Sequence, residues 1–307
     1  MDQTTLKTGC VAQRALSPGT EGMLLGALGV LAFSLSMPAM RAAAPELGGI
    51  FVGLGRSLVA ALPAGLVLFC LREPFPARRH WRGLALVALG VIIGFPLLSG
   101  LAMQSLPSVH GAVATGLLPA ATAVMGVLRA GERPSKLFWV GCLVGAAAVL
   151  AFAMAEGAGR PQSGDLLMLA GVGLGALGYA EGGRLAREMN GWRVICWALV
   201  LTAPLLIVPV LLAVGKHGLS ASPRAWVGFG YAALVSAFLG FFAWYRGLAL
   251  GGVARVGQIQ LVQPVLTLGW AALLLGEPIR LPSVLASLTL IGVAVFTQRL
   301  RAPPRET

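Results

Sequence analysis

A few polar side chains interrupt long apolar stretches of this sequence, and they are the groups best placed for chemistry. Arg56 stands among leucine, glycine and valine residues, where a guanidinium can bind a carboxylate through two parallel hydrogen bonds. The alternative is that Arg56 caps broken helix carbonyls or extends outward to solvent. Glu181 lies well inside another stretch, but Arg184 follows one helical turn later, so an intrahelical ion pair is expected there. A binding role and a structural role for Arg56 both stay open.

Two prolines within apolar stretches free backbone acceptors. Pro119 and Pro264 each remove one helical hydrogen bond and free the carbonyl four residues earlier. Those carbonyls belong to Thr115 and Gln260, and each needs a partner from protein or water. The partner is either water in a cavity or a neighbouring helix packed against the kink.

The candidate binding residues share two properties: they are polar, aromatic, flexible or helix-breaking, and they fall inside apolar stretches. They are Ser34, Met37, Arg56, Ser99, Thr115, Pro119, Tyr179, Trp197, Gln258, Gln260 and Pro264. Ser36 and Gln263 belong to the same class, whereas His110 fits a loop edge better. Trp244 and Tyr245 fit anchors at a membrane–water boundary better than ligand contacts.

The patterns that support catalysis or metal binding do not occur in the sequence. The three histidines are scattered, the four cysteines form no C-x-x-C, and there is no phosphate loop of the G-x-x-x-x-G-K type. We therefore expect no catalytic residue, no metal and no cofactor, and the protein is not expected to be an enzyme.

The composition indicates that these residues lie in membrane helices. The chain is 57% hydrophobic and 11% charged over 307 residues, which is more apolar than a soluble globular domain. Apolar stretches of about twenty residues, the length that crosses a bilayer core of about 30 Å, predict ten membrane helices. They are residues 22–41, 47–71, 82–106, 109–130, 135–155, 165–186, 193–214, 225–249, 253–276 and 279–298.

The sequence contains an internal repeat. LPAATAVMGVLRAGERPSK at 118–136 corresponds to VQPVLTLGWAALLLGEPIR at 262–280, with Pro119 and Glu132 displaced by 145 residues to Pro264 and Glu277. Each repeat holds five predicted helices, and an odd number places the second copy upside down in the membrane. We expect an all-α polytopic membrane protein with two inverted five-helix repeats, at 22–155 and 162–298, between tails at 1–21 and 299–307.

The repeated turn has a structural interpretation. Gly131 and Gly276 can end their helices in left-handed caps, and the glutamate that follows each favours a positive helix N-terminus.

Basic residues predict the orientation. With both termini in the cytoplasm, seventeen of the 23 Lys and Arg residues fall on the inner side and five on the outer side, with Arg56 inside a span. The net charge of +12 therefore records membrane topology, and no nucleic-acid partner is expected. The bilayer and a small-molecule substrate are the expected partners.

The repeated Pro-to-Gly-Glu pattern, the Ser163-Gly164-Asp165-Leu166 opening of the second repeat and Arg56 together resemble the ten-helix EamA-type branch of the drug/metabolite transporter superfamily. The resemblance covers about residues 22–298. It implies an exporter of amino acids or related metabolites, similar to aromatic and neutral amino-acid exporters, in a bacterial-type inner membrane. Pro278 departs from the pattern, because a basic residue follows Glu132 in the first copy.

We therefore expect a secondary transporter that alternates the exposure of a central cavity, with the substrate between the fourth and ninth helices. The alternatives are an ion or small-solute channel built from inverted repeats, and a transporter of drugs or nucleotide-sugar-like metabolites. Channels use rings of charge at a constriction, and the sequence contains no such ring. In this interpretation Gln260→Leu weakens substrate affinity, whereas a packed kink would make it alter stability instead.

Cysteine labelling tests the orientation. In a background without the four native cysteines, a membrane-impermeant thiol reagent should label a cysteine placed at Gly157 in intact cells and spare one placed at Arg78. The basic residues put the first position outside and the second inside. The reverse labelling would contradict the predicted orientation.

Overall fold

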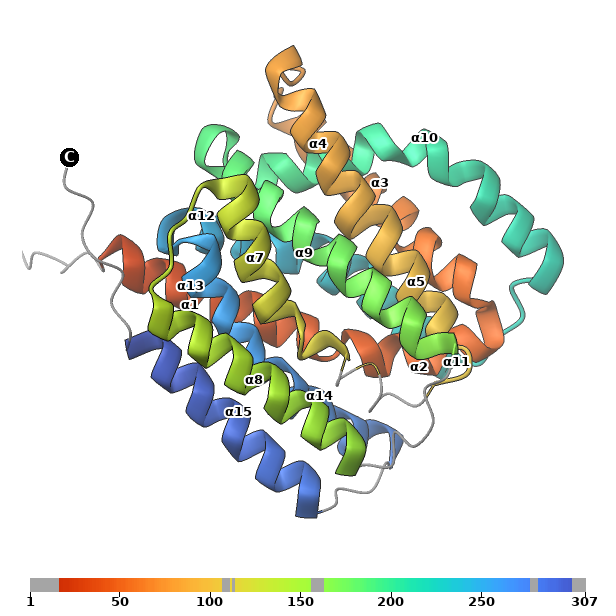
Figure 1. The fold of residues 1–307 in the computed structure, drawn as a ribbon. Helices are drawn as coiled ribbons and strands as arrows, with labels where there is room; N and C mark the ends of the chain where they lie inside the picture. Colours follow the sequence, from red (N-terminus) through yellow and green to blue (C-terminus); the bar gives the residue numbers. More distant parts are fainter. Residues whose placement is uncertain (1–16, 107–110, 112–113, 156–162, 277–280, 300–307) are drawn as a thin grey trace, which may run out of the picture.

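The computed structural model describes residues 17–106, 111, 114–155, 163–276 and 281–299, and every regular element in these ranges is a helix. The helices run mostly along one common direction (Figure 1). The first repeat contains α1 (Pro18–Ser34), α2 (Ser36–Leu47), η1 (Phe51–Gly55), α3 (Arg56–Cys70), η2 (Arg78–His80), α4 (Trp81–Val87), η3 (Ala88–Gly94), α5 (Phe95–Ala102), α7 (Leu118–Ala130) and α8 (Lys136–Ala155). The second contains α9 (Ser163–Met189), α10 (Gly191–His217), α11 (Pro223–Tyr231), η4 (Ala232–Leu239), α12 (Gly240–Gly251), α13 (Val253–Gly257), η5 (Gln258–Val262), α14 (Gln263–Trp270), η6 (Ala271–Leu275) and α15 (Leu281–Arg299).

The helices fit the predicted membrane spans. Seven continuous stretches are long and apolar enough to cross a bilayer: Pro18–Leu47, Phe51–Cys70, Arg78–Ala102, Ser163–Met189, Gly191–His217, Pro223–Gly251 and Val253–Leu275. The shorter apolar helices Leu118–Ala130 and Lys136–Ala148 occupy the fourth and fifth predicted spans, and α15 occupies the tenth. The chain is thus an all-α polytopic membrane protein, as the sequence predicts. His110, Gly157, Glu277, Pro278 and most of both tails lie outside the described residues.

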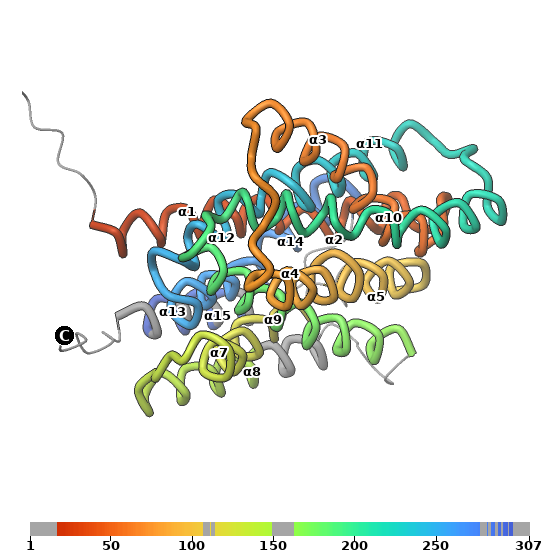
Figure 2. The backbone as a smooth tube through the Cα atoms, turned by 90° about the horizontal axis from the view of Figure 1, so that it is seen from above, coloured from red at the N-terminus to blue at the C-terminus, as the bar shows by residue number. Residues whose placement is uncertain are grey.

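The packing between the repeats follows a two-fold pattern. The first span packs on the eighth through α1 against α12 and α2 against α11, and the third packs on the sixth through α5 against α9. The second packs on the seventh (α3 against α10, Figure 2) and the fifth on the tenth, where α8 and α15 form one edge of the bundle (Figure 1). Exchanging the two repeats converts each pairing into another of the set or into itself. This is the relation that an inverted duplication requires.

The repeated prolines lie at the start of α-helical segments within their spans. Pro119 lies in the first turn of α7 and Pro264 in the first turn of α14, where a missing N–H costs no hydrogen bond. The segment before Pro264 is the 3₁₀ helix η5. The predicted left-handed caps are confirmed, with φ of 65° at Gly131 and 70° at Gly276.

Glu132 connects the two repeats. Its Oε1 accepts a hydrogen bond from the backbone N–H of Val253 and its Oε2 accepts one from that of Ala254, each at 2.6 Å. Arg187 donates to the same carboxylate at 3.1 Å. The predicted preference for a helix N-terminus is therefore met by α13, in the other repeat, and not by the helix that follows Glu132 in the chain.

Glycines allow close packing where the first and eighth spans cross. Gly22 and Gly26 of α1 face Gly247 and Gly251 of α12, and a Cβ added at Gly22 would lie 2.6 Å from the backbone nitrogen of Gly251. Because lipid tails are as apolar as leucine, such close van der Waals contact is a main source of helix association in membranes. This glycine contact holds α1 against α12.

Gly22→Ala is expected to destabilise the fold by about 1–3 kcal/mol, because the added methyl group meets backbone that cannot move aside easily. The melting temperature of the purified protein in detergent measures this. Gly173→Ala is the matched control, since a Cβ there has nothing within 4 Å and alanine favours a helix. Equal melting temperatures for the two variants would contradict the role given to the contact.

Candidate functional site

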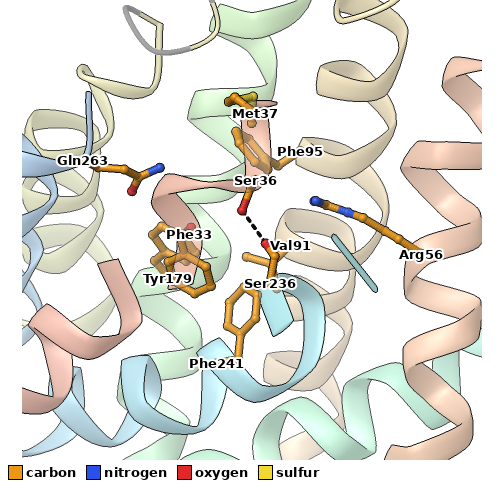
Figure 3. Close-up of a pocket in the computed structure, with 10 residues that line it drawn as sticks. All are labelled: Phe33, Ser36, Met37, Arg56, Val91, Phe95, Tyr179, Ser236, Phe241 and Gln263. Atoms are coloured by element: carbon orange, nitrogen blue, oxygen red, sulfur yellow. Dashed lines mark hydrogen bonds between the residues drawn. The ribbon is translucent and has the colours of Figure 1, made fainter. Parts of the chain in front are cut away.

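A cavity lies between the two repeats at the centre of the bundle (Figure 3). Six of its residues belong to the first repeat and four to the second, so neither half forms it alone. They are Phe33, Ser36, Met37, Arg56, Val91, Phe95, Tyr179, Ser236, Phe241 and Gln263. The volume of the cavity is only about 20 Å³, little more than one water molecule needs. The cavity is therefore narrow in this conformation and must widen for an organic solute.

A helix break in the first span shapes one wall of the cavity. Pro38 has no N–H to donate to the carbonyl of Ser34, and α1 ends at Ser34 while α2 begins at Ser36. The freed Ser34 carbonyl instead accepts a hydrogen bond from Thr267 Oγ1 of α14 at 2.7 Å. The break places Phe33, Ser36 and Met37 beside the cavity and connects the first span to the ninth.

Two π-helical segments contribute to the cavity lining at equivalent positions of the repeats. The segments are η3 in the third span and η4 in the eighth. Val91 and Ser236 are 145 residues apart and both line the cavity, so equivalent positions of the two repeats meet there. The hydroxyls of Ser36 and Ser236 are hydrogen bonded at 2.6 Å (Figure 3). Single π turns within helices are frequent at functional sites.

Arg56 points into the cavity from the start of α3 (Figure 3). The residue is 4% exposed, so it does not extend outward to solvent. Its Nη1 donates to Met40 Sδ at 3.3 Å, and its Nε has no hydrogen-bond partner. No helix carbonyl accepts from it among the described residues, so the structural alternatives considered for Arg56 do not apply in this conformation.

Aromatic rings form the apolar side of the cavity. Phe33 stacks on Tyr179 with ring centroids 6.2 Å apart, and Phe241 lies 5.0 Å from Phe33 and 6.0 Å from Tyr179. Trp244 packs behind them, 5.3 Å from Tyr179. Trp244 and Tyr245 are both 0% exposed, so the interpretation of these two as boundary anchors is wrong: both point into the bundle, where Tyr245 donates to the Gly178 carbonyl.

The structure brings together only some of the residues selected from the sequence. Met37, Arg56 and Tyr179 line the cavity. Ser34, Thr115 and Ser99 donate to carbonyls of their own helical segments, and Trp197 packs on Phe75 near one end of α10. Pro119, Pro264, Gln258 and Gln260 are buried away from the cavity lining.

Several residues of the cavity lining are absent from the binding residues that the sequence predicts. Ser36 and Gln263 are polar residues within apolar stretches, and Ser236 is a hydroxyl residue in the same kind of context. Gln263 Oε1 has no partner and its amide points toward the cavity (Figure 3). Phe33, Val91, Phe95 and Phe241 carry no signal that separates them from other apolar residues of their spans.

The buried Glu181 takes part in an ion network rather than in the cavity. Arg184 donates to its Oε1 at 2.7 Å, which confirms the predicted intrahelical pair, and Arg129 of α7 donates to its Oε2 at 3.0 Å. Two guanidiniums therefore satisfy this carboxylate, and the one from Arg129 connects α7 to α9.

The chain resembles known proteins over nearly its whole length. The EamA-like transporter family matches it twice, over residues 20–154 and 162–298. The uncharacterized transporter YdeK of Bacillus subtilis is 42% identical over 280 residues, which cover 91% of this chain and 98% of that protein. An uncharacterized Pseudomonas aeruginosa protein is 30% identical over 94% of this chain and 99% of its own length. One solved crystal structure superposes on this chain with a TM-score of 0.70 at 19% identity. The superposition covers 91% of this chain and 99% of that one, and it supports the fold alone.

Two glutamines should respond differently to replacement. Gln258 donates to the Pro119 carbonyl at 3.3 Å and to Cys142 Sγ at 3.5 Å, so Gln258→Leu should lower the stability by about 1 kcal/mol through the lost contacts between helices. The amide oxygens of both residues lack a partner, but Gln263 makes no side-chain hydrogen bond to another helix among the described residues, so Gln263→Leu should leave the melting temperature nearly unchanged. Thermal unfolding of both purified variants checks this. A larger loss for Gln263→Leu would show that its amide supports the fold.

Proposed function

The chain belongs to the EamA-like transporter family, and from this premise we propose that it exports small amphipathic organic solutes, amino acids first among them, through the central cavity. The coarser function follows from the family: this is an integral membrane transporter. The substrate class, the direction and the coupling are the proposed parts.

The observation that carries the proposal is the lining of the cavity by both repeats. Ser36 and Ser236 meet across it from opposite halves, and Gln263 of the ninth span faces Arg56 of the second across the same space (Figure 3). A site that lies between two inverted halves opens to one side of the membrane or to the other as the halves rock against each other. The proposed export therefore proceeds by alternating access around these residues.

The lining suits a molecule with one charged end and one apolar body. Arg56 and Gln263 supply polar contacts, while Phe33, Tyr179 and Phe241 supply flat apolar surface. Binding sites for small molecules combine such apolar walls with a few polar groups that fix orientation. An amino acid with an apolar or aromatic side chain matches this division.

The proposed cellular setting is a bacterial inner membrane with both termini in the cytoplasm. The bacterial relatives and the excess of basic residues on one side of the predicted topology support it. In that orientation export is movement from the side of the termini to the other.

A transport assay tests the proposal. The purified protein in liposomes should move radiolabelled apolar and aromatic amino acids down their gradients. Ser236→Leu should abolish this transport, because the larger side chain fills a cavity that is already narrow. Thr289→Leu on the exposed face of α15 is the control and should retain it. Absence of transport for every amino acid of the panel would overturn the proposed substrate class.

We further expect the transport to be facilitative or by exchange. Pumps that use protons carry chains of acidic or histidine side chains through the membrane, whereas Glu181 is held by Arg129 and Arg184. A pH gradient alone should therefore drive no substrate accumulation in proteoliposomes. Accumulation that depends on the gradient and disappears in Glu181→Gln would contradict this expectation.

A further inference from the structure

We propose that Arg56 binds the carboxylate of the substrate, and that the cavity selects for this carboxylate without requiring an α-amino group. The inference rests on the proposed function and narrows it. It implies that a carboxylic acid lacking the amino group binds at least as well as the amino acid of the same shape.

The first support is that Arg56 is a buried cation without an ionic partner. Its contact with Met40 Sδ is the single hydrogen bond that the described residues provide, and a thioether is a weak acceptor. The Nε atom has no partner at all. Burying an unpaired charge is costly, and a carboxylate that accepts two parallel hydrogen bonds from the guanidinium would remove that cost.

The second support is that the repeat does not need this charge. The second and seventh spans both follow a junction with positive φ, at Gly48 and Asn190, and counted from these junctions the position equivalent to Arg56 is Ala198 of α10. Ala198 is 1% exposed and Arg56 is 4% exposed, so both positions face the interior. The second and seventh spans pack against each other as equivalent elements, so the helix itself forms equally well with alanine. The arginine is a feature of the cavity and not of the fold.

The third support is that the cavity offers an ammonium group no carboxylate. Its described lining contains no Asp or Glu, and its acceptors are the amide oxygen of Gln263 and the hydroxyls of serine and tyrosine. An ammonium would lose its hydration for neutral acceptors only, and it would do so in the same space as the Arg56 guanidinium. The amino group therefore adds little to binding, while the carboxylate adds much.

Four probes of one shape separate these contributions. They are phenylalanine, 3-phenylpropanoate without the amino group, 3-phenylpropanamide without charge, and phenethylamine without the carboxylate. The ring suits the aromatic wall of Phe33, Tyr179 and Phe241. Binding to the purified full-length protein is measured from the rise in melting temperature with probe concentration, because a ligand of the folded state stabilises it by RT ln(1 + [L]/Kd), so a tighter ligand gives a larger rise at the same concentration.

The expected order is clear from the charges. 3-Phenylpropanoate should bind at least as tightly as phenylalanine, and the amide and the amine should bind at least about tenfold more weakly, the effect of losing a charge-assisted bidentate contact. Tighter binding of phenylalanine than of 3-phenylpropanoate would overturn the statement on the amino group. Equal binding of the amide, or no binding of either carboxylate, would overturn the proposal as a whole.

Variants at Arg56 separate a binding role from a structural one. Arg56→Gln should weaken 3-phenylpropanoate binding by about tenfold or more, and Arg56→Lys should lie between, since lysine keeps the charge but not the planar fork. Without ligand, Arg56→Gln should melt at the same temperature as the parent protein or higher, because an unpaired buried charge has been removed. Leu201→Gln, the same substituent on the exposed side of the seventh span, should retain binding. Undiminished binding by Arg56→Gln, or a lower melting temperature without ligand, would overturn the assignment.

The binding test is independent of the transport test. Failure to transport amino acids in liposomes, with carboxylate binding through Arg56 intact, would refute the proposed substrate class but leave this site standing. Transport of phenylalanine that is unchanged in Arg56→Gln would refute the site and leave the proposed function standing.

Discussion

Every polar group of the backbone must find a partner inside a protein that lies in hydrocarbon, and the helix breaks of this chain show how that constraint shapes it. The carbonyl freed by Pro38 is bound by Thr267 of the other repeat, and the N-terminus of α13 is bound by Glu132 of the first repeat. Both of these breaks are thus completed by a side chain from the other half. They lie beside the cavity or between the repeats, so the connections that satisfy the backbone also lie where the halves meet.

Much of the architecture was predictable from the sequence because it depends on local or periodic signals. Span positions follow from apolar length, the left-handed caps at Gly131 and Gly276 follow from the residue type, and the relation between repeats follows from an odd helix number. The cavity lining was predicted only in part. Gln258, Gln260 and Gln263 lie within six residues, but a 3₁₀ segment changes the helical phase between them, and of the three Gln263 alone reaches the cavity. A regular helical period cannot predict which residue faces inward across such a change.

The two repeats share a frame but differ in chemistry. Val91 and Ser236 occupy equivalent positions in the cavity lining, one apolar and one polar. The equivalent of Arg56, counted from the matching junctions at Gly48 and Asn190, is the buried Ala198. The described lining of the cavity contains one cation, Arg56. With the proposed carboxylate contact, this cation gives the substrate a single orientation in the cavity.

The bond between Glu132 and α13 has a consequence for biogenesis. Its partners Val253 and Ala254 are synthesised more than one hundred residues later, so this contact forms only after most of the second repeat has been made. The contact between the Ser34 carbonyl and Thr267 requires an even longer stretch of chain. The first repeat thus leaves the ribosome with contacts it cannot complete, and its final packing depends on membrane insertion of the ninth span.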